Sequence, residues 1–114
     1  MESQNDVPHI KSVGDAKKLI KKLHLDPGSE SHNRQLLDDG LQLIKHRMEY
    51  NEQLGLGLDI NSMGGWITQF IRDQLGAIIR DMKIVWILDD KTIIWDPSTG
   101  EVNDVNDGDS TSAI

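Results

Sequence analysis

The chain has 114 residues, no cysteine and a formal net charge of −7 at pH 7. This length predicts one domain that is large enough to bury a core of its own. The lack of cysteine excludes disulfides, thiolate metal sites and cysteine nucleophiles, and it favours the cytoplasm or another reducing compartment.

The charge is unevenly distributed along the chain. Residues 1–25 carry five lysines against three acidic residues, whereas residues 89–114 carry one lysine against seven acidic residues. An acidic protein of this kind is not drawn over long distances to nucleic acid or to anionic lipid.

The longest apolar run, residues 84–88, is far shorter than the roughly 20 residues that span a bilayer, and the first residues lack the apolar segment of a secretory signal. We therefore expect no membrane span.

The first predicted helix covers AKKLIKKLHL, residues 16–25. Its apolar residues recur at helical spacing, and its lysines occupy the other face. Asp15 is the expected N-cap, and DPG at residues 26–28 is the expected stop. Residues 1–12, which are polar and aperiodic, are expected to form a flexible arm before this helix.

The strongest helical pattern covers residues 29–54. Its apolar face is a stripe that is widened on one side, formed by Leu37, Leu41, Ile44 and Met48 and then by Leu36, Leu43, Tyr50 and Leu54. Ser29 or Ser31 is the expected N-cap, and Gly55 is the expected residue after the helix. Gly40 lowers helix stability by about 1 kcal/mol relative to alanine, which leaves open whether the helix is continuous.

A glycine-rich segment, GLGLDINSMGG, joins this helix to the next at residues 55–65. The phosphate-binding loops of nucleotide-binding folds follow a strand, and the P-loop places a lysine after its last glycine. Here the preceding element is a helix, and no such lysine follows. We interpret the segment as a helix end and a helix restart. An anion site at the backbone of Gly64 and Gly65 is the less favoured alternative.

A third helix is predicted over residues 66–82, with an apolar face wide enough for contacts on two sides. The pattern then changes its period from that of a helix to that of a strand. Two β-rich runs, residues 84–88 and 92–95, flank a polar turn at residues 89–91. These features predict an antiparallel hairpin that needs a helix to pack against.

A second turn follows at DPSTG, residues 96–100, and a third short strand over residues 101–105 is weakly indicated. The predicted fold class is α+β, with three helices followed by a C-terminal antiparallel hairpin. We expect a flexible arm over residues 1–12, a single domain over residues 13–100 and an acidic disordered tail over residues 101–114.

The chemistry-bearing residues form no recognised catalytic or metal-binding pattern. None of the four histidines belongs to a spacing such as HExxH, and no serine lies in a GxSxG motif. The carboxylate pairs at 38–39 and 89–90 are adjacent in sequence rather than opposed across a cleft. We predict no catalytic residue, no metal site and no cofactor. The last three residues, Ser-Ala-Ile, match the loose pattern that PDZ domains accept, which is a minor alternative.

Together these features predict a small non-enzymatic accessory or regulatory protein that acts through protein–protein interaction, either as a homodimer or with another protein. The apolar surplus on the second and third helices and the tryptophans of the hairpin support this expectation. If the hairpin turn is tight, two of these tryptophans are neighbours on one face. The predicted partner-binding residues are Trp66, Phe70, Leu75, Trp86 and Trp95.

The alternative is a nucleic-acid-binding regulator that uses the basic first helix and the start of the second. Asp38 and Asp39 repel phosphates close to that surface, and the acidic tail would reduce its affinity. An enzyme without an assigned reaction is the third and least favoured class. The predicted nucleic-acid contacts are Lys17, Lys18, Lys21, Lys22 and Arg34.

Overall fold

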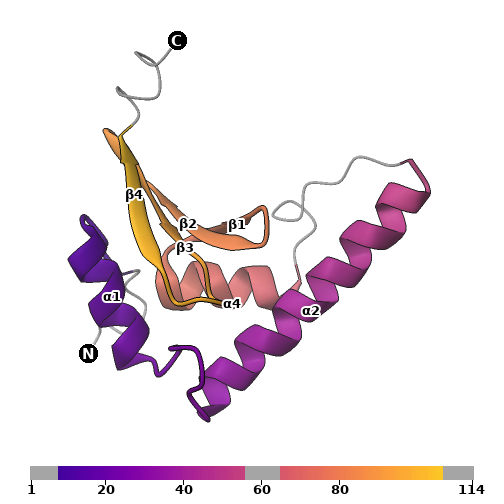
Figure 1. The fold of residues 1–114 in the computed structure, drawn as a ribbon, viewed down its shortest axis with the longest axis horizontal. Helices are drawn as coiled ribbons and strands as arrows, with labels where there is room; N and C mark the ends of the chain where they lie inside the picture. Colours follow the sequence, from indigo (N-terminus) through magenta and orange to yellow (C-terminus); the bar gives the residue numbers. More distant parts are fainter. Residues whose placement is uncertain (1–7, 56–64, 107–114) are drawn as a thin grey trace.

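The computed structural model describes residues 8–55 and 65–106 of the chain (Figure 1). Within these ranges three helices precede four strands: α1 (Val13–Lys22), α2 (His32–Gln53), α4 (Trp66–Leu75), β1 (Ile78–Arg80), β2 (Lys83–Ile87), β3 (Lys91–Trp95) and β4 (Val102–Asn106). The strands form one antiparallel sheet in the order β1-β2-β3-β4. The predicted α+β class is confirmed, with four strands in place of a hairpin. Among the described helices, none has the length and apolar content needed to cross a bilayer.

Helix α1 begins earlier than predicted, because Ser12 provides its N-cap. The Ser12 Oγ accepts a hydrogen bond from the backbone N–H of Asp15 at 3.1 Å, and the Asp15 carboxylate accepts one from the N–H of Lys11 at 3.0 Å. The prediction that Asp15 is the cap is therefore wrong, since Asp15 lies in the first turn. Just before the helix, Ile10 is buried in the core, although it falls within the expected flexible arm.

The connection from α1 to α2 is closed by backbone hydrogen bonds. The N–H of Leu25 donates to the carbonyl of Ile20 at 2.9 Å, and the N–H of His24 donates to that of Lys21 at 3.1 Å. His24 adopts a left-handed φ of 58°, as the residue after a helix commonly does. The chain thereby reverses within a few residues and buries Leu25 completely.

Helix α2 is continuous over 22 residues. Ser31 caps it by accepting a hydrogen bond from the N–H of Arg34 at 3.0 Å, and Gly55, with a φ of 74°, follows its end, both as predicted. Gly40 is buried in the middle of the helix because Ile67 of α4 packs directly over it. The glycine therefore allows the two helices to approach closely and does not interrupt α2.

Helix α4 ends at Leu75, and the prediction of a helix through residue 82 is wrong. Gly76 takes a left-handed φ of 67°, and its N–H donates to the carbonyl of Arg72 at 3.0 Å. The apolar run that follows has isoleucines that suit a strand as well as a helix, and it forms β1. Gly76 thus ends α4 within a continuous apolar pattern, and the residues that follow it form the first strand of the sheet.

The sheet presents one face to the helices. The register pairs Ile84 with Trp95 and Trp86 with Ile93, so the two tryptophans share that face as diagonal neighbours rather than as a direct pair. Helix α1 packs against β4, and α4 packs against β1 and α2 (Figure 1). The largest fully buried side chains of the resulting core are Leu25, Leu37, Ile71, Leu75, Ile84, Ile93 and Trp95.

Strand β4 comes from the stretch that was expected to be a disordered tail. Val102 is buried and pairs with Trp95, which draws an otherwise exposed polar segment onto the sheet. Lys91 of β3 forms an ion pair with Asp104 across the strands at 3.9 Å. The folded domain therefore extends through Asn106. The third strand that the sequence weakly indicated over residues 101–105 is confirmed as β4.

Candidate interaction surface

The structure separates the five predicted partner-binding residues into two groups. Leu75, Trp86 and Trp95 are buried in the core of the chain itself. The indole N–H of Trp86 donates to the carbonyl of Leu75 at 2.6 Å, so these two residues hold the end of α4 to the sheet. Trp66 is 46% exposed and Phe70 is half-buried. A partner that leaves the fold intact can therefore reach only Trp66 and Phe70 of this set.

The five residues predicted to contact nucleic acid are also divided. The four lysines of α1, at positions 17, 18, 21 and 22, are all exposed. Arg34 is only 9% exposed; its Nη1 donates to the carbonyl of Leu25 at 2.8 Å, and its Nη2 lies 3.0 Å from the Asp38 carboxylate. Arg34 therefore fastens the connection between α1 and α2. The basic surface is reduced to the lysine face of α1.

Two open hollows lie on the described surface. One, of about 610 Å³, lies between residues 8–11 and the turn that joins β2 to β3. The other, of about 510 Å³, lies between α2 and the turns of the sheet, and its lining includes Lys45, Asp81 and Lys83. In the described ranges no three histidine or carboxylate side chains are grouped so that they could hold a metal ion. Both hollows therefore carry charges of both signs.

The second hollow contains the carboxylate of Asp96, which closes the turn between β3 and β4. The Ser98 hydroxyl donates to Asp96 Oδ1 at 2.7 Å, and the Ser98 backbone N–H donates to the same oxygen at 3.0 Å. These hydrogen bonds, the hydroxyl above all, lower the pKa of Asp96 below its ordinary value. The arrangement is that of a turn-forming aspartate, and it stabilises the DPSTG turn that the sequence predicts.

Among the described residues, α2 carries four of the seven large hydrophobic side chains that are exposed. Its inward side is formed by Leu37, Gly40 and Ile44, which are buried. A second row lies to one side of these residues, about 120° around the helix from Leu37 and about 60° from Gly40, at 100° per residue. We call this row the α2 stripe; it consists of the half-buried Leu36 and of Leu43, Tyr50 and Leu54, which are 46%, 62% and 56% exposed.

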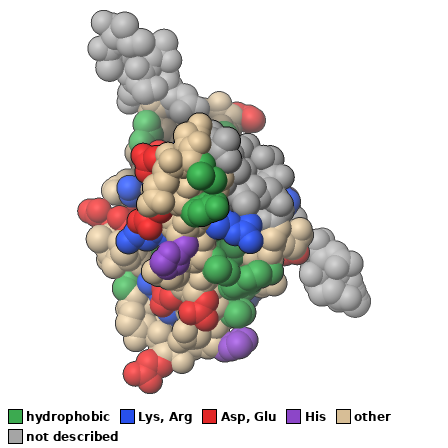
Figure 2. Space-filling view, turned by 90° about the vertical axis from the view of Figure 1, so that its right-hand side faces the viewer, with side chains coloured by type: hydrophobic (Ala, Val, Ile, Leu, Met, Phe, Trp, Pro, Cys, Tyr) green, Lys and Arg blue, Asp and Glu red, His purple; other side chains and the backbone are tan. Residues whose placement is uncertain are grey.

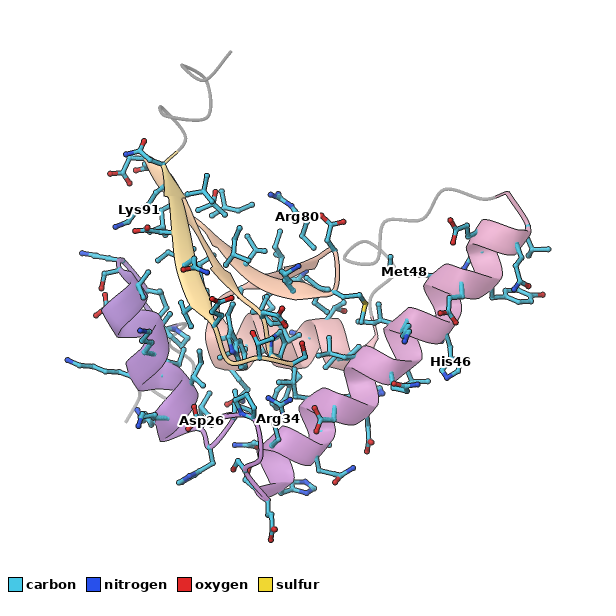
Figure 3. All side chains as sticks on the ribbon, viewed as in Figure 1. Asp26, Arg34, His46, Met48, Arg80 and Lys91 are labelled. Atoms are coloured by element: carbon cyan, nitrogen blue, oxygen red, sulfur yellow. The ribbon has the colours of Figure 1, made fainter. Side chains whose placement is uncertain are left out.

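The C-terminal half of α2 extends beyond the rest of the molecule (Figure 1). Ile44 is the last buried residue of the helix, so the turns that follow rest on little of the described core. His46 projects away from the sheet, whereas Met48 projects toward it (Figure 3). Figure 2 shows this side of the molecule, where hydrophobic side chains lie in groups among basic and acidic ones.

Sequence reasoning found the residues of the α2 stripe but placed them in a widened core face. The signal for a separate surface is the spacing of seven residues from Leu36 to Leu43 and again to Tyr50, which puts them on one line. The sequence pattern cannot show how little of α2 is covered by the other helices and the sheet. A helix that is apolar on two sides is buried on both only if the fold supplies two partners.

A second apolar surface lies on the sheet face opposite the tryptophans. The register aligns Ile78, Val85 and Ile94 across three strands, with Ile87 and Val105 exposed in the next row. Val85 is nevertheless buried, so its row offers less accessible surface than the α2 stripe.

Comparison with known proteins adds no relative to these observations. No protein-family model, no curated protein and no solved structure matches the chain. Of the anion-site alternative at Gly64 and Gly65, Gly64 lies outside the described residues, and Gly65 is the exposed N-cap residue of α4, with a φ of 109°. The PDZ alternative at residues 112–114 lies outside the described residues. On the described surface, the α2 stripe is the strongest candidate for an interaction site.

Proposed function

We propose that this protein is a non-enzymatic accessory or regulatory factor that works by binding a protein through the α2 stripe. The observation that carries the proposal is the exposure of Leu43, Tyr50 and Leu54 along one line of a helix that extends beyond the core. Single exposed apolar residues are ordinary on soluble proteins, but an aligned row of large ones is typical of an interaction site.

The proposed surface has the form of a known recognition mode, in which a helix places a row of side chains into an apolar groove. Such helices present anchors that recur every three, four or seven residues. Fully burying a leucine-sized side chain contributes roughly 1.5–3 kcal/mol, and tyrosine is enriched among the residues that dominate binding energy.

Site-specific photocrosslinking tests the proposal whatever the identity of the partner. A photoreactive phenylalanine analogue replaces Leu43 in one variant and Tyr50 in another, and both are irradiated in the cells that naturally make the protein. Adducts with a defined protein, which can be a second copy of this chain, are expected at both positions. The matched control is Glu52, which is exposed on the same protruding segment but lies half a turn away from Leu43 around the helix.

An absence of specific adducts would contradict the proposal. If the analogue at Leu43 and Tyr50 yields no more protein adducts than it does at Glu52, the α2 stripe is not a binding surface. Because Leu43 and Tyr50 are exposed, the substitutions leave the core unchanged, and a native circular dichroism spectrum confirms that each variant is folded.

Nucleic-acid binding is the second candidate, and the exposed lysine face of α1 is the observation that favours it. Its test is binding to short duplexes as a function of salt, where four phosphate contacts give a steep loss of affinity. Replacing the lysines at 17, 18, 21 and 22 by glutamine should abolish binding. A tail deletion in this test must begin after Asn106, since β4 is part of the sheet. Absence of binding at low salt would exclude this candidate.

A further inference from the structure

We propose that the partner of the α2 stripe is a second copy of this chain, with the two α2 helices antiparallel about a two-fold axis at Leu43. This inference rests on the proposed function, because it uses the same surface and names its occupant. It is drawn from the spacing of the apolar residues along α2, the order of its charges and the direction of its free face.

The apolar side chains of the stripe are arranged symmetrically about Leu43. Leu36 lies seven residues before it and Tyr50 seven residues after it, which is about 10.5 Å in each direction at the rise of an α-helix. When two helices cross antiparallel at Leu43, the Leu36 of each copy lies level with the Tyr50 of the other. The leucines at position 43 then meet on the axis, and the contact forms three apolar rows.

The charges beside the stripe are arranged antisymmetrically about the same point. Asp39 precedes Leu43 by four residues and Arg47 follows it by four, so each has the opposite charge at the matching height. An antiparallel pair therefore places the Asp39 of one copy level with the Arg47 of the other, and it does so twice. A parallel pair would place like charges together, which is unfavourable.

Both side chains are free to form these contacts. Asp39 Oδ1 accepts a hydrogen bond from Gln35 on the same helix at 3.1 Å, which holds the carboxylate at the helix surface. Within residues 8–55 and 65–106, the Arg47 guanidinium forms no ion pair, whereas Asp38 is paired with Arg34 at 3.0 Å. Asp39 and Arg47 are thus the charges beside the stripe that a second copy can pair.

The second copy binds α2 beside the face that packs on the core. The stripe lies about 120° around the helix from Leu37 and about 100° from Ile44, and it borders the α4 contact because it lies about 60° from Gly40. The apolar rows from Leu36 to Tyr50 extend over only about 21 Å of the helix, so the proposed contact is small beside the roughly 1,200–2,000 Å² of stable complexes. We therefore expect a dimer with a dissociation constant on the order of micromolar to tens of micromolar.

Disulfide trapping tests the arrangement, and the chain suits it because it has no cysteine of its own. Leu43→Cys should cross-link to itself under mild oxidation, since the two thiols meet on the axis. Tyr50→Cys alone should not, because the two positions lie about 21 Å apart along antiparallel helices. The double variant Leu36→Cys/Tyr50→Cys should cross-link across copies. Glu49→Cys, exposed on another side of the same helix, reports the rate of random collision.

Sedimentation equilibrium of the unmodified chain provides the second measurement. The mean mass should rise from monomer to dimer with concentration, and Asp39→Arg or Arg47→Asp should each weaken association about tenfold. The double variant Asp39→Arg/Arg47→Asp should restore it, because the swapped charges are again complementary. Leu43 is intact in all three variants, so their effects report the charges alone.

Two results would overturn the inference. One is a monomer at several hundred micromolar together with Leu43→Cys cross-linking no faster than Glu49→Cys. The other is efficient cross-linking of Tyr50→Cys alone, which shows a parallel pair. Photocrosslinking to a different protein at Leu43, in a chain that is monomeric by sedimentation, would retain the proposed function and reject self-association.

Discussion

Gly40 of α2 and Ile67 of α4 meet so closely that the position has no space for a side chain. A Cβ built on Gly40 would lie 2.7 Å from the Cβ of Ile67 and closer still to the rest of that side chain. Ile67 is itself buried and therefore cannot swing away freely. The glycine sets the distance between the two helices, and with it the orientation of the protruding half of α2.

Gly40→Ala should destabilise the protein although alanine is the better helix former. The gain in helix propensity is about 1 kcal/mol, whereas overpacking a core typically costs about 1–3 kcal/mol. Because the clash with Ile67 is severe, we expect a net loss of up to about 2 kcal/mol in the free energy of unfolding, measured by urea denaturation.

The matched control is Gly14→Ala in α1, where the new methyl group meets only the Ser12 hydroxyl at 3.6 Å. That variant should be unchanged or slightly more stable. Combining Gly40→Ala with Ile67→Ala should cost less than the sum of the two single changes, because the second removes the clash of the first. Additive losses would show that the two residues do not limit the helix spacing.

The contact between Gly40 and Ile67 also shows what sequence reasoning can and cannot reach. The periodicity of α2, its Ser31 cap and the hairpin of β2 and β3 depend on local patterns, and all three are present in the structure. The sequence around Gly40 is the same whether this glycine only weakens its own helix or allows a second helix to pack closely against it. The decision depends on Ile67, which is distant in sequence and which no local pattern connects to it.

The residues of the candidate surface likewise could not be identified from local patterns alone. Trp86 and Trp95 are predicted as partner-binding residues because of their residue type, yet the register of the sheet places both in the core. The periodicity of α2 predicts that Tyr50 and Leu54 are core residues. Both are exposed, because α2 extends beyond the described elements that could cover them. Which apolar face is left exposed depends on helix length relative to the body, a property of the assembled fold.

The left-handed conformation of His24 provides a second prediction. His24 is exposed at the end of α1 with a φ of 58°, a conformation that costs a residue with a Cβ roughly 1 kcal/mol or more. His24→Gly should raise the free energy of unfolding by about 0.5–1 kcal/mol, since the relief of strain exceeds the added entropy of the unfolded chain. Thermal or urea denaturation measures the change.

Gly28→Ala is the complementary control for this prediction. Gly28 has a φ of 85°, and no heavy atom lies within 4 Å of a Cβ built on it. The alanine variant should lose about 1 kcal/mol from backbone strain alone. A loss of stability in His24→Gly would reveal that the imidazole contributes a contact worth more than the strain.

The two buried tryptophans should respond differently to the same substitution. The Trp86 indole N–H donates to the carbonyl of Leu75 at 2.6 Å, whereas the Trp95 indole nitrogen is buried without an acceptor among the described residues. Trp86→Phe removes a buried hydrogen bond and orphans a carbonyl at the end of α4, in addition to the volume that both substitutions remove. Trp86→Phe should therefore cost about 1 kcal/mol more than Trp95→Phe.

Urea denaturation of both variants, followed by circular dichroism so that the signal does not depend on a tryptophan, measures the difference. Trp66→Phe is the control, because Trp66 is exposed and its replacement should change stability by less than about 0.5 kcal/mol. Equal losses for the two buried tryptophans would mean that the hydrogen bond to Leu75 contributes nothing to stability.

The turn between β3 and β4 should make a small, pH-dependent contribution to stability through Asp96. The pKa of Asp96 is lowered in the folded state by the Ser98 hydroxyl, by the Ser98 N–H and by the nearby charge of Lys83. A lowered pKa means that the stabilisation is complete above the unfolded pKa, about 3.9, and is lost as the pH falls through the folded value. The advantage is therefore present at pH 7 and absent at strongly acidic pH.

Asp96→Asn keeps an oxygen that can accept from Ser98 but removes the charge, so it should be less stable than the native chain at pH 7. The gap should narrow as the pH falls below the unfolded pKa and should close below the lowered folded pKa, because the native carboxyl is then also neutral. Ser98→Ala should move the pKa of Asp96 up toward its ordinary value, which an NMR titration of the carboxyl carbon measures. Glu30→Gln, which removes an exposed charge without removing a hydrogen bond, is the control for net charge. If the gap between native protein and Asp96→Asn is the same at pH 7 and at pH 3, the hydrogen bonds at Ser98 do not favour the ionised carboxylate.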